Sequence, residues 1–428
     1  MFVPAQGDGR EIFMDFDMGN FIGDLGHLIA IKSVKGNCGE ISDEYPLGKG
    51  IADALKYLLS LGEKFGMKTK NLDNCCGYIE IGEGEKLLGI LVHADTVDAG
   101  DNWTHAPFML TLDGDKIYGR GIADDKGGAL ITLYAMKYLK ENNLIKDKRV
   151  RLIIGGDEES GEWECIKRYK KTEEIPDIAF SPDGHYPVIY AEKGILKIKI
   201  SKENDDKEFV FSGGKTVNAV PDFAECTYRG KNYTEKGKTA HSMKPYMGVN
   251  AVLNLGKQLE TNGISNSFTK LLASANPTDW DIAFCDRPSG ELTVNPSVAK
   301  VHGRENYLIC DIRYPVTCSA DEIMEAINKK VSKLGYKAEV LNHQKPLYIE
   351  KDSHLISTLL SVYNEITGED AKPVSMGGGT YARAFPNAAA FGTHFPDTES
   401  VEHQPDEYWK ISDIEKNFKI LSEAIKRL

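Results

Sequence analysis

The sequence predicts an α/β protein with a mostly parallel sheet, into which a smaller α+β domain is inserted. Helical and strand patterns alternate up to residue 191 and again after residue 350, as in a parallel sheet covered by helices. Between these segments, charged residues interrupt the apolar strands, which indicates strands with one solvated face. We therefore expect one discontinuous domain formed by residues 1–191 and 350–428, and an inserted domain formed by residues 192–349.

Apolar spacing defines the elements of the first domain. Continuous apolar runs predict strands buried on both faces, and apolar residues every three or four positions predict helices. A capping box of Ser412 and Glu415 predicts the start of the last helix. The other predicted helices are 47–65 and 127–139, and the predicted strands are 87–92, 150–154 and 177–180.

In the inserted domain, Ile198 and Ile200 alternate with Lys197 and Lys199, which predicts a strand that is wet on one face. A second such strand is expected at 306–314. Helical spacing occurs at 249–259 and 321–334. Antiparallel strands with helices on one side are typical of an α+β domain.

Composition excludes several classes of protein. The 428-residue chain has a net charge of −12, which disfavours nucleic acid as a partner, because phosphate binding needs a basic surface. It contains no apolar run of about 18 residues and no N-terminal signal pattern, so we expect a cytoplasmic protein without a membrane span. None of its 8 cysteines forms a Cys-x-x-Cys pair, which argues against a thiolate zinc site.

Five short segments carry acidic residues or histidines where strands end and loops begin, the edge at which open α/β sheets bind ligands. Each has a structural alternative: a lone histidine is more often structural, an Asp before a helix is a common cap, and an acidic run is often a solvated loop. Taken together, two imidazoles and three carboxylates suit two divalent metal ions with a bridging carboxylate. The segments centre on His93 with Asp95, Asp124 with Asp125, Glu158 with Glu159, Asp183, and His403.

Three further features suit substrate binding. His241 and Arg313 lie in the inserted domain, and Arg is suited to a carboxylate, although an ion pair is the simpler interpretation. The Gly377–Thr380 run offers backbone N–H groups for an anion, with a flexible turn as the alternative. The chain lacks the spacing of a dinucleotide fingerprint or a phosphate loop.

These motifs, in their order along the chain, resemble those of the co-catalytic zinc peptidases. This family includes carboxypeptidases, aminoacylases, succinyl-diaminopimelate desuccinylase and dipeptidases. The chain is most similar to the PepV-type dipeptidases, from about residue 20 to the C-terminus. The cues for that subgroup are the segments 119–127, 181–187, 313–315 and 377–381. The resemblance implies a metal-binding catalytic domain and an inserted lid domain.

The resemblance also implies residue roles. His93 and Asp183 hold one metal ion, Glu159 and His403 hold the other, and Asp124 bridges them. Asp95 orients His93, and Glu158 is the general base. The residues expected to bind the substrate carboxylate and the tetrahedral intermediate are Asn218, His241, Arg313, Gly378, Gly379 and Thr380.

The implied activity is hydrolysis of dipeptides with two divalent ions, zinc first, with manganese or cobalt as alternatives. An N-acyl amino acid deacylase or desuccinylase of the same family is the other candidate, since the lid sets specificity. A non-catalytic peptide-binding protein predicts lost ligands, yet all five ligands and Glu158 are present. The chain is shorter than typical PepV-type members, so we expect a trimmed lid. A monomer is favoured, and a homodimer, in which His241 serves the partner, stays open.

Overall fold

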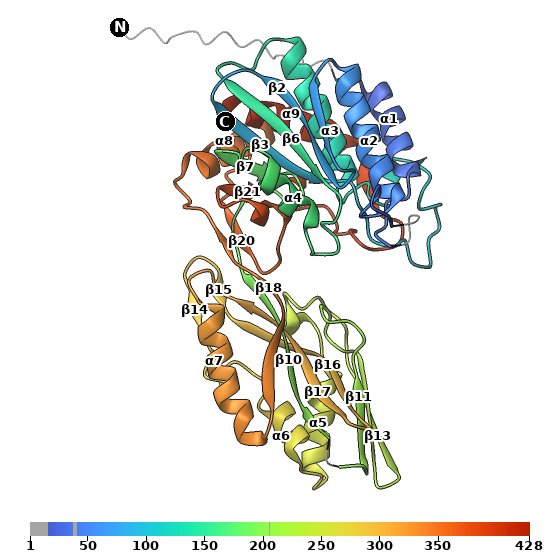
Figure 1. Ribbon diagram of the computed structural model, residues 1–428, viewed down its shortest axis with the longest axis vertical. Helices are drawn as coiled ribbons and strands as arrows, with labels where there is room; N and C mark the ends of the chain where they lie inside the picture. The colour runs from blue at the N-terminus through green and yellow to red at the C-terminus, as the bar shows by residue number, and fades with distance from the viewer. Residues whose placement is uncertain (1–15, 37–40, 205) are drawn as a thin grey trace. The chain divides into compact units, whose positions relative to one another are not determined.

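The computed structural model describes residues 16–36, 41–204 and 206–428 (Figure 1). Two compact units arise from the chain's own contacts. Unit 1 comprises Met1–Val188, Lys351–Lys372 and Asn387–Leu428, and unit 2 comprises Ile189–Glu350 and Pro373–Pro386. Segment 373–386, which the sequence analysis placed in the first domain, therefore belongs with unit 2. The reason is that β20 (Val374–Met376) pairs with β9 (Ile189–Glu192) at the start of that unit.

The central sheet of unit 1 is mainly parallel, as predicted. β6, β3, β7 and β21 run parallel (Figure 1). Beyond β6, β2 pairs antiparallel with β6, and β1 pairs antiparallel with β2. From Leu87 to His93 every residue of β3 is buried, as expected for a strand covered on both faces. The strands, in sheet order, are β1 (Lys68–Leu72), β2 (Cys76–Gly82), β6 (Lys148–Gly155), β3 (Lys86–His93), β7 (Ile178–Ser181) and β21 (Ala388–Ala390).

Helices cover both faces of this sheet. Leu55 of α2 lies against Gly77 of β2, whereas Tyr169 of α4 packs edge-on against Tyr78. Successive residues of a strand point to opposite faces, so α2 and α4 lie on opposite sides. The helices are α1 (Met18–Ala30), α2 (Lys49–Lys64), α3 (Lys126–Glu141), α4 (Glu164–Thr172), α8 (His354–Thr367) and α9 (Ile411–Arg427).

The start of α9 corrects one prediction. The helix begins at Ile411 with Lys410 as its N-cap residue, and no side chain caps it. Ser412 lies inside the first turn, and its hydroxyl donates to Asp115 at 3.3 Å, so the predicted capping box is wrong. The physical reason is that β23 (Tyr408–Lys410), paired with β5 (Lys116–Tyr118) next to β4 (Thr111–Asp113), runs directly into the helix.

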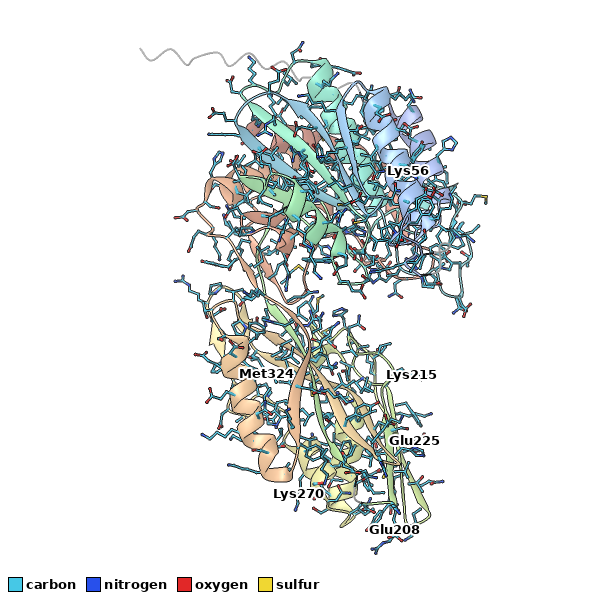
Figure 2. The ribbon with its side chains drawn as sticks, in the orientation of Figure 1. Lys56, Glu208, Lys215, Glu225, Lys270 and Met324 are labelled. Atoms are coloured by element: carbon cyan, nitrogen blue, oxygen red, sulfur yellow. The ribbon has the colours of Figure 1, made fainter. Side chains whose placement is uncertain are left out.

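Unit 2 is built on an antiparallel sheet with its core on one face. Ile198 and Ile200 are buried, while Lys197 and Lys199 are partly exposed, which confirms the predicted alternation. In Figure 2, Lys270 on α6 and Glu225 on β12 are exposed, and Met324 on α7 packs against the core. The sheet order is β13 (Lys231–Lys236), β12 (Phe223–Tyr228), β11 (Phe209–Gly213), β16 (Thr293–His302), β17 (Glu305–Tyr314), β10 (Gly194–Glu203) and β18 (Lys337–Gln344).

Three helices of unit 2 contribute to that core: α5 (Ala251–Thr261), α6 (Ser267–Ala273) and α7 (Ala320–Val331). Two of them match the predicted helices at 249–259 and 321–334, the second of which ends in a 3-10 turn, η2 (Ser332–Leu334). In the part of the chain that the structure describes, no helix combines the length and apolar character needed to cross a membrane.

Candidate metal centre

The carboxyl ends of three parallel strands bring the predicted ligands to one edge of the unit 1 sheet. His93 ends β3 and is paired in register with Gly155, the last residue of β6. The loop after β6 carries Glu158 and Glu159, and the loop after β7 carries Asp183. Because parallel strands end at the same edge, these side chains start close together. Asp124 enters from the loop before α3, and His403 from the loop before β23.

Asp124 lies between the two imidazoles and offers one carboxylate oxygen to each. Its Oδ1 is 2.9 Å from His93 Nε2, and its Oδ2 is 3.0 Å from His403 Nε2. The second imidazole is also 3.0 Å from Glu159 Oε2, and the first is 3.8 Å from Asp183 Oδ2. The structure thus brings the five residues expected to be ligands close together, with Asp124 between the two imidazoles.

Burial makes this group of acids electrostatically unfavourable without a cation. Burial, followed by the charge of Asp124, raises the pKa of Glu159 to about 7 and that of Asp183 to about 6. Burial also opposes ionisation of Asp124, but hydrogen bonds from His403 and His93 hold its pKa below the ordinary value. Imidazole nitrogens and carboxylate oxygens are the donor set that zinc, manganese and cobalt accept. The residues therefore fit bound divalent ions.

The two imidazoles differ in exposure. The side chain of His93 is fully buried, whereas that of His403 is 49% exposed. The carboxylates between them are 10–16% exposed. The group is therefore reached by solvent from the side of His403.

Glu158, the expected general base, lies beside the same group. A carboxylate oxygen of Glu158, a nitrogen of His93 and an oxygen of Asp183 lie within 4.8 Å of one another. Burial raises the pKa of Glu158 well above its usual range, and neighbouring acids add to the shift. A carboxyl group with a raised pKa is suited to accept and return a proton near neutral pH.

Asp95 contacts both His93 and the acidic loop. His93 Nδ1 is 3.0 Å from the main-chain oxygen of Asp95, and 3.5 Å from its carboxylate. The carboxylate accepts the backbone N–H groups of Glu158 at 3.2 Å and Glu159 at 3.1 Å. The sequence predicted only that Asp95 orients His93. The structure adds that its carboxylate holds the loop that carries the two glutamates.

Sequence reasoning missed the role of Glu407, which is buried and linked to Arg120 at 2.6 Å. The same carboxylate accepts the backbone N–H groups of Gly121 at 3.0 Å and Ala123 at 2.8 Å, and lies 3.3 Å from that of Asp124. Glu407 therefore fixes the backbone that presents Asp124. The available signal was an arginine between two glycines, since a buried guanidinium needs an anionic partner.

Asp157, the first acid of the run in the third segment, has a structural role. It is fully buried and accepts the backbone N–H groups of Glu164 at 2.9 Å and Cys165 at 3.1 Å, at the start of α4. Lys35 Nζ lies 3.4 Å from the same carboxylate. A carboxylate at a helix N-terminus is stabilised by the orphan N–H groups there. Only the next two acids of the run face the candidate metal group.

The predicted substrate-binding residues belong to unit 2, and three segments of that unit meet. Arg313 is buried, and binds Asp311 through Nε at 2.7 Å and Nη2 at 2.8 Å, so it forms a buried ion pair rather than the surface ion pair that was the alternative. Its Nη1 donates to the carbonyl of Gly377 at 3.0 Å. A side chain on Gly377 or Gly378 would press against Met243, two residues after His241.

The other predicted substrate-binding residues differ in solvent exposure. Thr380 is buried, and both its hydroxyl, at 2.6 Å, and its N–H, at 3.2 Å, donate to Glu192. Asn218, His241 and Gly379 are exposed, and Gly378 is buried. Sequence reasoning missed Glu192 and its partner Arg383, which donates from Nε at 2.6 Å and whose Nη2 holds the carbonyl of Gly378 at 2.6 Å. Two buried ion pairs thus hold the glycine loop.

Comparison with known proteins identifies relatives in both sequence and fold. The chain is 36% identical to "Putative dipeptidase YtjP" of Bacillus subtilis, over 90% of this chain and 92% of that protein. In fold it is similar to an M20 family metallo-carboxypeptidase, Sso-CP2, from Sulfolobus solfataricus, with a TM-score of 0.63, 19% identity and coverage of 96% and 99% of the two chains.

Human carnosine dipeptidase 1 has the same fold, with a TM-score of 0.62 and 12% identity over 95% of each chain. Residues 89–427 match the profile described as Peptidase family M20/M25/M40. The parallel sheet with acids and histidines at its carboxyl edge, the matched profile and the relative at 36% identity lead to one conclusion: this chain belongs to peptidase family M20/M25/M40, a family of metal-dependent hydrolases.

Proposed function

We propose that the protein is a dipeptidase that uses two divalent metal ions. The observation that carries the proposal is the position of Asp124, whose two oxygens face His93 and His403 separately. A carboxylate that faces two imidazoles in this way is suited to bridge two cations. His93 and Asp183 would hold one ion, and Glu159 and His403 the other. Zinc fits this donor set first, with manganese and cobalt as alternatives.

Bound ions would polarise the peptide carbonyl and lower the pKa of an attacking water. Glu158 accepts the proton of that water, because burial makes its carboxyl group a stronger base than an ordinary glutamate. It then returns the proton to the amine that leaves. Asp95 keeps Glu158 and Glu159 in position through their backbone N–H groups.

The arrangement in unit 2 supports recognition of a short substrate. Gly378 and Gly379 lie in a loop fixed by Arg313 and Arg383. Backbone N–H groups of such a loop, with His241 and Asn218, suit the carboxylate and the developing oxyanion of a small peptide. The name of the Bacillus subtilis relative makes dipeptides the first substrates to test.

The test is metal analysis of the purified protein, followed by assays with zinc, manganese and cobalt on dipeptides, tripeptides and N-acetyl amino acids. We expect about two ions per chain at this centre and preferential turnover of dipeptides. Preference for N-acetyl amino acids would assign the alternative deacylase activity. Full activity on dipeptides after complete removal of metal would contradict the proposed mechanism. Size-exclusion chromatography and cell fractionation would test the predicted monomer and cytoplasmic location.

A further inference from the structure

A second group of potential ligands lies in unit 1, close to the five residues described above, because Asp124 and Asp183 act electrostatically on one of its members, His394. β8 (Gly184–His185) and β22 (Thr393–His394) pair in parallel, and their register sets His185 beside His394. The ring centroids of the two histidines are 5.4 Å apart. The pairing of these two short strands therefore brings the two imidazoles close together.

Glu402 completes this group. Its Oε1 is 2.9 Å from His394 Nδ1, and the hydroxyl of Ser400 donates to the other carboxylate oxygen. One ligand atom from each of His185, His394 and Glu402 lies within 4.8 Å of the other two. The imidazole-to-carboxylate distance equals the 2.9–3.0 Å found where His93 and His403 meet Asp124. The same spacing of donor atoms thus occurs twice in unit 1.

The buried imidazole of His394 has binding capacity that the described protein atoms do not use. His394 is 6% exposed, and its Nε2 has no hydrogen-bond partner among the described residues. A buried polar atom without a hydrogen-bond partner is energetically unfavourable, which favours a bound ligand at this place. The ion pair with Glu402 accounts for Nδ1 of His394, but it leaves Nε2 without a partner among the described residues.

We propose that His185, His394 and Glu402 form a third cation site, which takes a divalent transition-metal ion such as zinc. Two imidazoles and one carboxylate are a known zinc-binding set that leaves a fourth position for water. With neutral imidazoles, Glu402 contributes a single negative charge, which suits a divalent cation. The ion joins the loop that precedes His403 to β8 and β22, so it braces the segment that carries that residue.

The test uses the full-length protein, stripped with a chelator and then equilibrated with zinc. We expect three zinc ions per wild-type chain and two in His394→Leu, by elemental analysis after removal of loosely bound metal. His354→Leu, at an exposed position on α8, is the matched control and is expected to keep three. Asp124→Asn instead disrupts the pair of metal ions that Asp124 is proposed to bridge. This variant is expected to keep the zinc ion that His394→Leu loses.

The outcomes separate this site from the proposed function. Two ions in both the wild type and His394→Leu overturn the third site and leave the dipeptidase proposal intact. A single wild-type ion that disappears in His394→Leu supports the third site and contradicts the two-metal mechanism. If His394→Leu does not fold, His185→Asn with cobalt absorption spectra replaces it. Loss of one set of cobalt absorption bands in His185→Asn supports the third site. Spectra identical to those of the wild type overturn the proposal.

Discussion

Both units contain buried carboxylates paired with a guanidinium, such as Glu407 with Arg120 in unit 1, but only unit 1 also gathers buried acids around imidazoles. In unit 1, Asp124, Glu159 and Asp183 gather with two imidazoles, and burial raises the pKa of the last two acids. In unit 2, each buried carboxylate has a guanidinium: Asp311 binds Arg313, and Glu192 binds Arg383. Buried charges are stable when paired and costly when gathered with like charges. The contrast suggests that unit 1 is built to receive cations, while unit 2 uses its charges to hold a loop.

The largest expected effect comes from removal of metal, which tests whether the acids of unit 1 need cations. Dialysis against a chelator should abolish peptide hydrolysis, because the remaining side chains supply no Lewis acid. Zinc, manganese or cobalt added back should restore turnover, measured with a dipeptide assay. Turnover that persists when less than about a tenth of an ion remains per chain would contradict the view that the acids of unit 1 bind cations needed for hydrolysis.

The next effect is expected for Glu158→Gln, which keeps the shape of the side chain but removes the base. The rate constant kcat should fall by about 10²- to 10⁴-fold, the usual contribution of general acid–base catalysis. Metal content should stay unchanged, as measured by elemental analysis. Glu162→Gln, an exposed position on the same loop, is the matched control. Equal activity of the two variants would exclude Glu158 as the base.

In unit 2, Arg313→Met should destabilise the protein, since it leaves Asp311 buried without its partner. The expected loss is about 3–5 kcal/mol in the free energy of unfolding, measured by denaturant titration. The exposed pair of Arg229 and Glu208 offers a comparison, and Arg229→Met should cost at most about 1 kcal/mol. Similar losses of stability in both variants would show that burial does not determine how much each ion pair contributes to stability. A raised KM in folded Arg313→Met would add a role in substrate binding.

A smaller effect is expected from Glu407→Gln, which weakens the contacts that hold the backbone of Asp124. Metal affinity should fall by about 10- to 100-fold, as is usual when a group that supports a ligand is changed. A competition titration with a metal-binding dye measures it. Glu415→Gln, exposed on α9, is the control. Unchanged affinity in Glu407→Gln would mean that the position of Asp124 is set by other contacts.

Strong local patterns predicted much of the fold. The apolar runs at 87–92 and 150–154 became β3 and β6, and the helical spacing at 127–139 became α3. β13 was missed because its residues are exposed or only partly buried, so its apolar pattern is weak. The segment 373–386 was assigned to the wrong unit because its pairing with β9 joins residues that are far apart in the chain.

For the candidate site, the order of the predicted ligands along the chain was readable, and the convergence of His93, Glu159 and Asp183 followed from the common edge of a parallel sheet. The contacts that hold these residues in place could not be predicted from the sequence. Arg120 and Glu407 are 287 positions apart, and only the folded chain brings them together. Asp157 looked equivalent to the acids beside it until its contacts with the start of α4 separated it from them.

The link between Arg120 and Glu407 has a consequence for synthesis of the protein. Translation delivers the sheet strands β1 to β7 and α3 early, but His403 and Glu407 are added only near the end. A nascent chain of 400 residues therefore has the acids of unit 1 without the imidazole and the carboxylate that complete their surroundings. Under the proposed function, a chain that ends before His403 would lack one of the two imidazoles that face Asp124, and it would be inactive.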